Sequence, residues 1–214
     1  MPRWASGPVG MPPYWTRAVR ELGAADPILK TVISGCGEDG LTGQNDPFVT
    51  LARSIVGQQI SVRAADSIWG RLEAAVTEVA PAQVVAAGPE KLRAAGLTNR
   101  KSSYVCDIAA AFVDGQMGRH IWHGQADEVV IDALCELRGV GRWTAEMFLI
   151  FHLLRQDVLP LADIGLRRAV AINYRDGADV SPEEVEAIAE AWRPWRSVAT
   201  WYLWRSLDPV PVTY

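Results

Sequence analysis

The chain has few cysteines and no long apolar run, and both shortages exclude whole classes of protein. Its three cysteines among 214 residues lie far apart, too few for a four-cysteine iron–sulfur cluster or a disulfide framework. No stretch approaches the roughly 18 uncharged apolar residues that a membrane-spanning helix needs. Residues 1–13 lack the apolar core of a secretory signal. We therefore expect a cytoplasmic protein with no iron–sulfur cluster and no membrane partner.

An excess of positive charge is also missing, because the net charge is −4 at pH 7. This excludes a protein that coats nucleic acid through bulk positive potential. The charge is unevenly distributed, however. Residues 137–175 hold six basic and three acidic side chains, and residues 91–101 hold four basic and no acidic ones. These segments are either solvated helix ends or local contacts to a polyanion such as DNA.

Helix signals divide the chain, and the segments between them follow a period of 3.6 residues more often than a period of two. The following residues are typical of helix starts: Asp46-Pro47, Ser61, Thr98 and the capping box Ser181-Pro182-Glu183-Glu184. We therefore expect an all-α fold with helices beginning at these positions.

Further helices are expected in the second half of the chain. One begins at Asp127 and ends near Leu137, and after a glycine turn the next runs from Trp143 to Leu154. This second helix is apolar nearly all round, as a central buried helix should be. A last helix is expected to begin at Pro194.

The glycine turn Gly139-Val140-Gly141 between two of these helices is the first candidate site. Two glycines allow the backbone to turn sharply with its amides exposed, while Val140 anchors the turn in the core. The N-terminus of the following helix adds free N–H groups and the positive end of its dipole, which suits a phosphate oxygen. Such a contact positions DNA without reading its sequence. An ordinary αα-hairpin with a glycine turn shows the same pattern.

Four ordered blocks give the chain a resemblance to the helix-hairpin-helix (HhH-GPD) superfamily of DNA glycosylases, of the DNA-3-methyladenine glycosylase II (alkylpurine) type. The blocks are residues 54–61, 137–145, 157–168 and 192–204. The likeness extends over about residues 13–209, and four blocks in order are far more specific than any one of them.

The resemblance implies an all-α fold of two helical lobes with a DNA- and base-binding cleft between them, and no N-terminal β-rich domain. The chain would form a single glycosylase unit over residues 1–214. Its central lobe, with the hairpin, would cover about residues 46–155. The second lobe would combine residues 13–45 and 156–209.

The same resemblance makes Asp163 the catalytic carboxylate. Cleavage of an N-glycosidic bond builds positive charge on the deoxyribose, and a carboxylate about 4 Å away is worth roughly 4 kcal/mol at an effective dielectric constant of 20. Asp163 would either stabilise this cation or orient and deprotonate the attacking water. An aspartate before Ile164-Gly165-Leu166 is also a good helix N-cap, and one side chain can serve both purposes.

Trp143 separates two kinds of glycosylase. Bifunctional members of the superfamily place a Schiff-base lysine at this point of the hairpin, and tryptophan cannot form that covalent intermediate. The resemblance therefore predicts a monofunctional enzyme of base excision repair without AP-lyase activity. Two alternatives stay open: the mismatch or oxidised-base branch of the superfamily, and a non-catalytic helix-hairpin-helix module that only binds DNA.

The resemblance also groups residues around an extruded base. The base pocket would consist of Trp143, Trp204, Met147, Phe148 and Trp201. An alkylated purine that carries positive charge gains up to about 2 kcal/mol over an aromatic face. The wedge that fills the vacated stack would be Asn99 or Leu97, and Gln58 and Gln59 would face the orphaned base. For Gln58 and Gln59 an ordinary helix C-terminal turn explains the sequence equally well.

The remaining predictions concern the DNA backbone. The hairpin would bind a phosphate through Gly139, Val140, Gly141, Arg142 and Thr144, and Arg100 and Lys101 would contact phosphates elsewhere. No cofactor is required, but relatives suggest a Na⁺ or K⁺ ion held by the carbonyls of Cys135, Leu137 and Val140. The predicted partner is double-stranded DNA with damaged bases of the 3-methyladenine and 7-methylguanine class, bound by a monomer.

Overall fold

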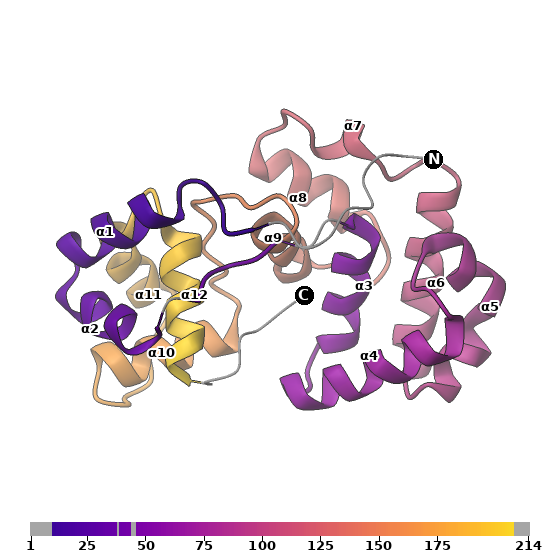
Figure 1. The fold of residues 1–214 in the computed structure, drawn as a ribbon, viewed down its shortest axis with the longest axis horizontal. Helices are drawn as coiled ribbons and strands as arrows, with labels where there is room; N and C mark the ends of the chain where they lie inside the picture. Colours follow the sequence, from indigo (N-terminus) through magenta and orange to yellow (C-terminus); the bar gives the residue numbers. More distant parts are fainter. Residues whose placement is uncertain (1–9, 38, 44–45, 208–214) are drawn as a thin grey trace. The chain divides into compact units, whose positions relative to one another are not determined.

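The computed structural model describes residues 10–37, 39–43 and 46–207 (Figure 1). The helices in this part of the chain are α1 (Trp15–Ala25), α2 (Pro27–Gly35), α3 (Pro47–Gly57), α4 (Val62–Val76), α5 (Pro81–Ala94), α6 (Asn99–Val113), α7 (Arg119–Trp122), α8 (Asp127–Cys135), α9 (Arg142–Phe151), α10 (Ile164–Tyr174), α11 (Pro182–Ala189), the 3₁₀-helix η1 (Glu190–Trp192) and α12 (Arg196–Leu207). These residues form helices without an extended strand, which confirms the all-α prediction. None of the described helices is long and apolar enough to cross a bilayer.

The chain divides into two compact units. Of the described residues, unit 1 contains 10–37, 39–43 and 149–207, and unit 2 contains 46–148. The boundary falls inside α9, whereas the sequence placed it near residue 155. The segments at residues 1–9 and 208–214, which include the end of the predicted second lobe, lie outside the described residues.

Unit 1 is organised around α12, which packs against α1, α2 and α10 (Figure 1). Every residue of α12 from Ser197 to Trp204 is buried. A polar group also lies in this core. Asp26 accepts hydrogen bonds from Tyr174 Oη at 2.6 Å and Trp192 Nε1 at 3.0 Å, and it caps α2 through the N–H of Leu29 at 3.0 Å. These partners replace the water that Asp26 loses on burial. Through them the aspartate joins α2, α10 and η1.

Unit 2 contains α3 to α8 and the first part of α9, with α6 packed against both α3 and α5. The core between α3 and α6 includes Phe48, whose ring meets Phe112 edge-on at a centroid distance of 5.7 Å. Val56, near the end of α3, is also buried. The ring contact joins the first turn of α3 to the last turn of α6. At the other end of α3, where several candidate site residues lie, Lys101 on α6 donates to the carbonyl of Val56 at 2.8 Å.

The local helix signals are confirmed. The side chain of Asp46 caps α3 through the N–H of Val49 at 3.0 Å, and Thr98 caps α6 through the N–H of Lys101 at 3.2 Å. Ser181 forms the complete capping box of α11. The pair Asp26-Pro27 at the start of α2 carries the same signature as Asp46-Pro47, and α2 could have been predicted from it.

Three helix limits differ by two or three residues from those expected. The helix α8 ends at Cys135 and α9 ends at Phe151. The chain leaves the helical conformation after α9, and Leu154 has a φ of 52°, in the left-handed region. The last helix begins at Arg196 and not at Pro194. The N–H of Ser197, in its first turn, has no partner within the helix and donates instead to the carbonyl of Gln156 at 3.1 Å.

Candidate active site and nucleic-acid contacts

Asp163 is the residue immediately before α10 and caps that helix, as its sequence context predicts. Its Oδ1 accepts hydrogen bonds from the N–H of Leu166 at 2.6 Å and from Trp204 Nε1 at 2.8 Å. The side chain is half-buried, whereas the next residue, Ile164, is 79% exposed. One donor is a main-chain N–H of α10 and the other is a side chain of α12. Together they hold the carboxylate in one orientation beside an open surface.

Trp204 is fixed from two directions. Besides its hydrogen bond to Asp163, its indole stacks on Phe151 with a centroid distance of 5.9 Å and an interplanar angle of 10°. Gly165 permits this approach, since a Cβ there would lie 3.1 Å from Asp163 Oδ1 and 3.3 Å from Trp204 Cδ1. The structure thus brings together two predicted site residues and adds Phe151 and Gly165, which the sequence analysis missed.

Trp201 has a packing role in unit 1. It is 2% exposed and meets Trp15 edge-on at a centroid distance of 5.3 Å. In unit 2, Met147 and Phe148 are fully buried, and the Phe148 ring packs edge-on against Trp122 at 5.1 Å. Trp201, Met147 and Phe148 are therefore core residues of their units. Trp143, in the first turn of α9, is half-exposed.

The two glycines of the hairpin have different tasks. Gly139 has a φ of 90°, and a Cβ on it would overlap the ring of Tyr104 on α6. A Cβ on Gly141 would meet no described atom within 4 Å. Val140 between them is buried, as predicted, and its N–H donates to the carbonyl of Leu137 at 3.0 Å. Packing therefore requires Gly139, while Gly141 leaves the outer surface of the turn clear for an approaching group.

The side chains of Gln58 and Thr144 are hydrogen-bonded to each other. The amide Nε2 of Gln58, at the C-terminal end of α3, donates to the carbonyl of Gly139 at 3.1 Å and to Thr144 Oγ1 at 3.0 Å. Thr144 is 1% exposed. Both side chains therefore hold the hairpin from within. The predicted contacts of Thr144 with a phosphate and of Gln58 with an orphaned base stay predictions. Gln59 is exposed, with a φ of 59°.

Lys101 is likewise turned inward. Its ammonium group donates to the carbonyls of Val56 at 2.8 Å and Gln58 at 2.7 Å, at the C-terminal end of α3. Burial lowers the pKa of this lysine. The ammonium group is thus bonded within the protein, and the predicted phosphate contact of Lys101 stays a prediction. The adjacent Arg100 is exposed and has no hydrogen bond or ion pair with any described residue.

The two wedge candidates differ in exposure. Leu97 is 5% exposed and belongs to the core of unit 2, so it has no surface with which to enter a base stack. Asn99 is exposed at the first position of α6, and its Oδ1 accepts a hydrogen bond from Arg93 at 3.4 Å. Exposure therefore favours Asn99 over Leu97 as the wedge, and the wedge stays a prediction.

The basic charge predicted around the hairpin is largely compensated. Arg142 donates to both carboxylate oxygens of Glu128, at 2.9 and 2.7 Å, and to Glu146 at 3.0 Å. These hydrogen bonds lower the pKa of Glu128 and raise that of Arg142. Arg138 pairs with Asp107 at 2.8 Å. In this structure the guanidinium donors of Arg142 bind carboxylates, and its predicted phosphate contact stays a prediction.

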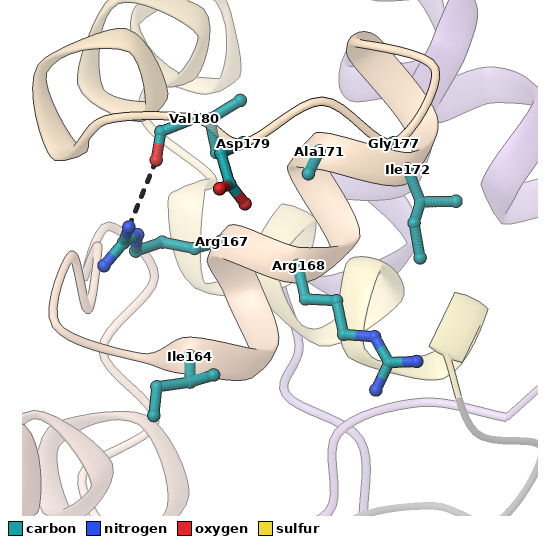
Figure 2. A pocket seen from close by; sticks show the side chains of 8 residues that line it. All are labelled: Ile164, Arg167, Arg168, Ala171, Ile172, Gly177, Asp179 and Val180. Carbon is teal, nitrogen blue, oxygen red and sulfur yellow. Dashed lines mark hydrogen bonds between the residues drawn. The ribbon is translucent and has the colours of Figure 1, made fainter.

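A groove of about 320 Å³ lies along α10 in unit 1 (Figure 2). It is lined by Ile164, Arg167, Arg168, Ala171, Ile172, Gly177, Asp179 and Val180. Figure 2 shows that Arg167 and Arg168 leave the helix in different directions. Arg167 donates to the carbonyl of Val180 at 3.3 Å, whereas Arg168 is exposed and has no hydrogen bond or ion pair within the described ranges. Arg168 is therefore a cation available to an anionic partner.

Metal-binding side chains do not gather anywhere in the described residues: no group of three or more His, Cys, Asp or Glu is placed to hold an ion. Carbonyl oxygens near the hairpin are a separate matter. The carbonyl of Leu137 accepts one hydrogen bond, from Val140, and retains a second lone pair. Carbonyl oxygens of this kind can bind Na⁺ or K⁺, and the ion on the carbonyls of Cys135, Leu137 and Val140 stays a prediction.

Comparison with known proteins identifies a family whose model matches most of the chain. Residues 52–194 match the HhH-GPD superfamily base excision DNA repair protein family. The chain is 30% identical over 167 residues to DNA-3-methyladenine glycosylase 1 of Schizosaccharomyces pombe, covering 76% of this chain and 73% of the relative.

Two solved structures are similar as well. One is a DNA-3-methyladenine glycosidase from Bacillus halodurans, with 35% identity, a TM-score of 0.73 and 89% of each chain covered. The other is a 3-methyladenine DNA glycosylase from Schizosaccharomyces pombe in complex with abasic DNA, with 27% identity, a TM-score of 0.81, and coverage of 92% of this chain and all of that chain. With a hairpin and a capping aspartate in the expected order, the chain belongs to the HhH-GPD superfamily of base excision DNA repair proteins.

Proposed function

We propose that this chain is a monofunctional DNA glycosylase of base excision repair, which flips alkylated purines out of duplex DNA and hydrolyses their N-glycosidic bonds. The observation that carries the proposal is the Asp163–Trp204 pair, in which a half-buried carboxylate is held by an indole N–H at 2.8 Å. The names of the relatives support 3-methyladenine and similar alkylated bases as the substrate class.

Asp163 supplies the fixed negative charge that this reaction needs. Loss of the purine leaves positive charge on the deoxyribose, and a carboxylate about 4 Å away contributes roughly 4 kcal/mol, or about a thousandfold in rate. Its orientation is already set by Leu166 and Trp204, so little reorganisation accompanies the reaction. The same carboxylate is the candidate to orient the attacking water.

Aromatic side chains would bind the extruded base. Trp204 is placed beside the proposed catalytic carboxylate by its own hydrogen bond, and a cationic purine gains stabilisation over such a ring. Trp143 is half-exposed and is the second candidate. Met147, Phe148 and Trp201 are core residues in this structure. They would contribute to the predicted pocket by shaping its walls and not by direct contact with the base.

The hairpin would bind a phosphate with main-chain N–H groups of the turn and of the N-terminus of α9. The open space at Gly141 supports this role, and the carboxylate pairs of Arg142 leave the backbone as the anion-binding group. A Na⁺ or K⁺ ion on the carbonyls of Cys135, Leu137 and Val140 would add positive charge beside that phosphate. Arg100 and Arg168 are the exposed cations that would contact other phosphates.

Asn99 would fill the space left by the base, from the first position of α6. Gln59 would face the orphaned partner, since its side chain is exposed whereas that of Gln58 is used within the protein. The absence of AP-lyase activity is proposed from Trp143 at the hairpin, where bifunctional relatives have a lysine. Lys101 is an unsuitable nucleophile, because its ammonium group already donates to two carbonyls.

The test is release of free purines from methylated duplex DNA by the wild type and by Asp163→Asn. Asparagine retains the oxygen that accepts from Leu166 and Trp204 but removes the charge. The wild type should release 3-methyladenine and 7-methylguanine, and the variant should be about a thousandfold slower. No release by the wild type, or equal release by the variant, would refute the proposal. Borohydride treatment tests the monofunctional claim, since a trapped covalent adduct would contradict it.

A further inference from the structure

Three segments that are distant in sequence meet at the C-terminal end of α3. The carbonyl of Gln58 accepts from Lys101 on α6 at 2.7 Å, and its side-chain amide donates to Gly139 of the hairpin at 3.1 Å. One residue is thus bonded to α6 through its backbone and to the hairpin through its side chain. All of these residues lie within unit 2, so the connection belongs to a single compact body.

Lys101 is unusually placed for a cation of a DNA-binding protein. Its ammonium group lies at the negative end of the α3 dipole, where the last carbonyls lack helical partners. Burial lowers its pKa, and the two carbonyl acceptors compensate for part of the water lost. A lysine that served a phosphate would instead extend into solvent, as Arg100 does.

A second contact reinforces the first. Tyr104, one turn after Lys101 on α6, packs its ring against Gly139 so closely that a Cβ there would overlap it. The guanidinium of Arg138, beside Gly139, lies 5.5 Å from the centre of the same ring. The first turns of α6 are therefore joined to the hairpin directly through Tyr104 and indirectly through Lys101 and Gln58.

From this geometry we infer that Lys101 and Gln58 are positioning residues that fix the N-terminus of α6, with its wedge residue Asn99, relative to the hairpin. The inference rests on the proposed function. Extrusion of a base costs a few kcal/mol, and a wedge can act on the stack only if the strand is held by an element that does not move away. Lys101 and Gln58 connect the wedge to the element that holds the strand, and they couple phosphate binding to base flipping.

The experiment compares Lys101→Met and Gln58→Met with the wild type on two DNA duplexes. One contains 7-methylguanine, which must be extruded, and the other contains a tetrahydrofuran abasic analogue, which has no base to extrude. Both variants should lower the single-turnover rate of 7-methylguanine release about tenfold or more, while the Kd for the abasic duplex stays within about threefold. Fluorescence of 2-aminopurine beside the lesion should report a smaller flipped fraction.

Arg100→Met is the matched control, because it removes the same charge from the neighbouring, exposed position. It should weaken binding of both duplexes alike and reduce the slope of log K against log salt by about 0.9, the value for one lost phosphate contact. Lys101→Met should leave that slope unchanged. Lys101→Arg, whose guanidinium can also donate to the two carbonyls, should recover most of the lost rate.

Several outcomes would overturn the inference. If Lys101→Met reduces the salt slope and weakens both duplexes as Arg100→Met does, Lys101 contacts DNA directly. If both methionine variants release base at the wild-type rate, the connection has no function. If rates per folded molecule recover fully once thermal unfolding is accounted for, the two residues only stabilise the fold. A wild type that releases no base from any alkylated duplex would refute the proposed function itself, which separates the two failures.

Discussion

The two units use different chemical groups for their candidate functions. In unit 1 the site is made of side chains, since the carboxylate of Asp163 is oriented by the indole of Trp204. In unit 2 the hairpin offers main-chain N–H groups, and the nearby polar side chains of Gln58, Thr144 and Arg142 bind within the protein. The difference suggests that chemistry and DNA binding can be separated by substitution, with side chains controlling one and backbone shape the other.

The largest expected effect is on the chemistry of unit 1. Asp163→Asn should slow base release about a thousandfold because it removes the charge that faces the developing cation. Its affinity for a duplex with an abasic analogue should change by less than about threefold, since the hairpin is untouched. Fluorescence anisotropy beside a single-turnover assay measures both quantities. A parallel loss of affinity would mean that Asp163 binds DNA and does not only act on the sugar.

Gly139→Ala should have the next largest effect, and it should fall on stability. The φ of 90° costs an alanine of order 1–3 kcal/mol, and overlap with the Tyr104 ring adds to that cost. Thermal unfolding measures the loss. A combined Gly139→Ala and Tyr104→Ala variant should recover part of it, and no recovery would show that strain in the backbone alone is responsible.

Trp204→Phe should reduce the rate by about 10- to 100-fold. Phenylalanine keeps a ring that can stack on Phe151 but cannot donate to Asp163, and a hydrogen bond to a charged group is worth about 1.5–3 kcal/mol. Single-turnover kinetics at saturating enzyme checks this. Gly165→Ala disturbs the same pair by crowding, because its Cβ would lie 3.1 Å from Asp163 Oδ1, and it should also slow the reaction. An unchanged rate in both variants would contradict the role of the pair.

Gly141→Ala is the counterpart of Gly139→Ala and should show the reverse behaviour. Its Cβ would meet no described atom within 4 Å, so the free energy of unfolding should change by less than about 1 kcal/mol. The methyl group would stand where a phosphate is proposed to approach, and affinity for the abasic duplex should fall about tenfold. A stable variant that binds the abasic duplex with wild-type affinity would show that the hairpin does not contact DNA at Gly141.

Arg168→Gln should have the smallest effect, a reduction of about 0.9 in the slope of log K against log salt. Arg168 is exposed on α10 and is unpaired within the described ranges (Figure 2). Lys30→Gln is the matched control, because Lys30 is an exposed cation on α2 of the same unit. Equal slopes for both variants would mean that α10 has no particular part in DNA binding.

Local features were predictable because their causes lie within a few residues. Asp46, Thr98, Asp163 and Ser181 each cap a helix through an N–H three residues ahead. Such a bond depends on the side chain and the adjacent backbone alone, so a short stretch of sequence contains the whole interaction. The superfamily was predicted from four ordered blocks, and the order of such blocks can also be read from the sequence alone.

The partners of Gln58, Lys101 and Arg142 could be found only in the tertiary structure. In sequence each is a polar residue in a motif that suggests DNA, and each was assigned to DNA. Apart from Glu146, four residues after Arg142, their partners lie 14 to 86 residues away along the chain. Only the packing of the helices shows that these groups are already bonded. The same holds for Leu97 and Asn99, which are two residues apart but differ in burial.

The sequence by itself therefore determined the all-α class, the helix caps, the family and the identity of Asp163 as the candidate carboxylate. The tertiary structure decided which predicted contacts remain available to DNA, since a donor bonded inside the protein has less to offer a ligand. It also supplied Phe151, Gly165 and Tyr104, which support the candidate residues through ring stacking and close packing. Such contacts depend on shape across distant segments, and no local pattern records them.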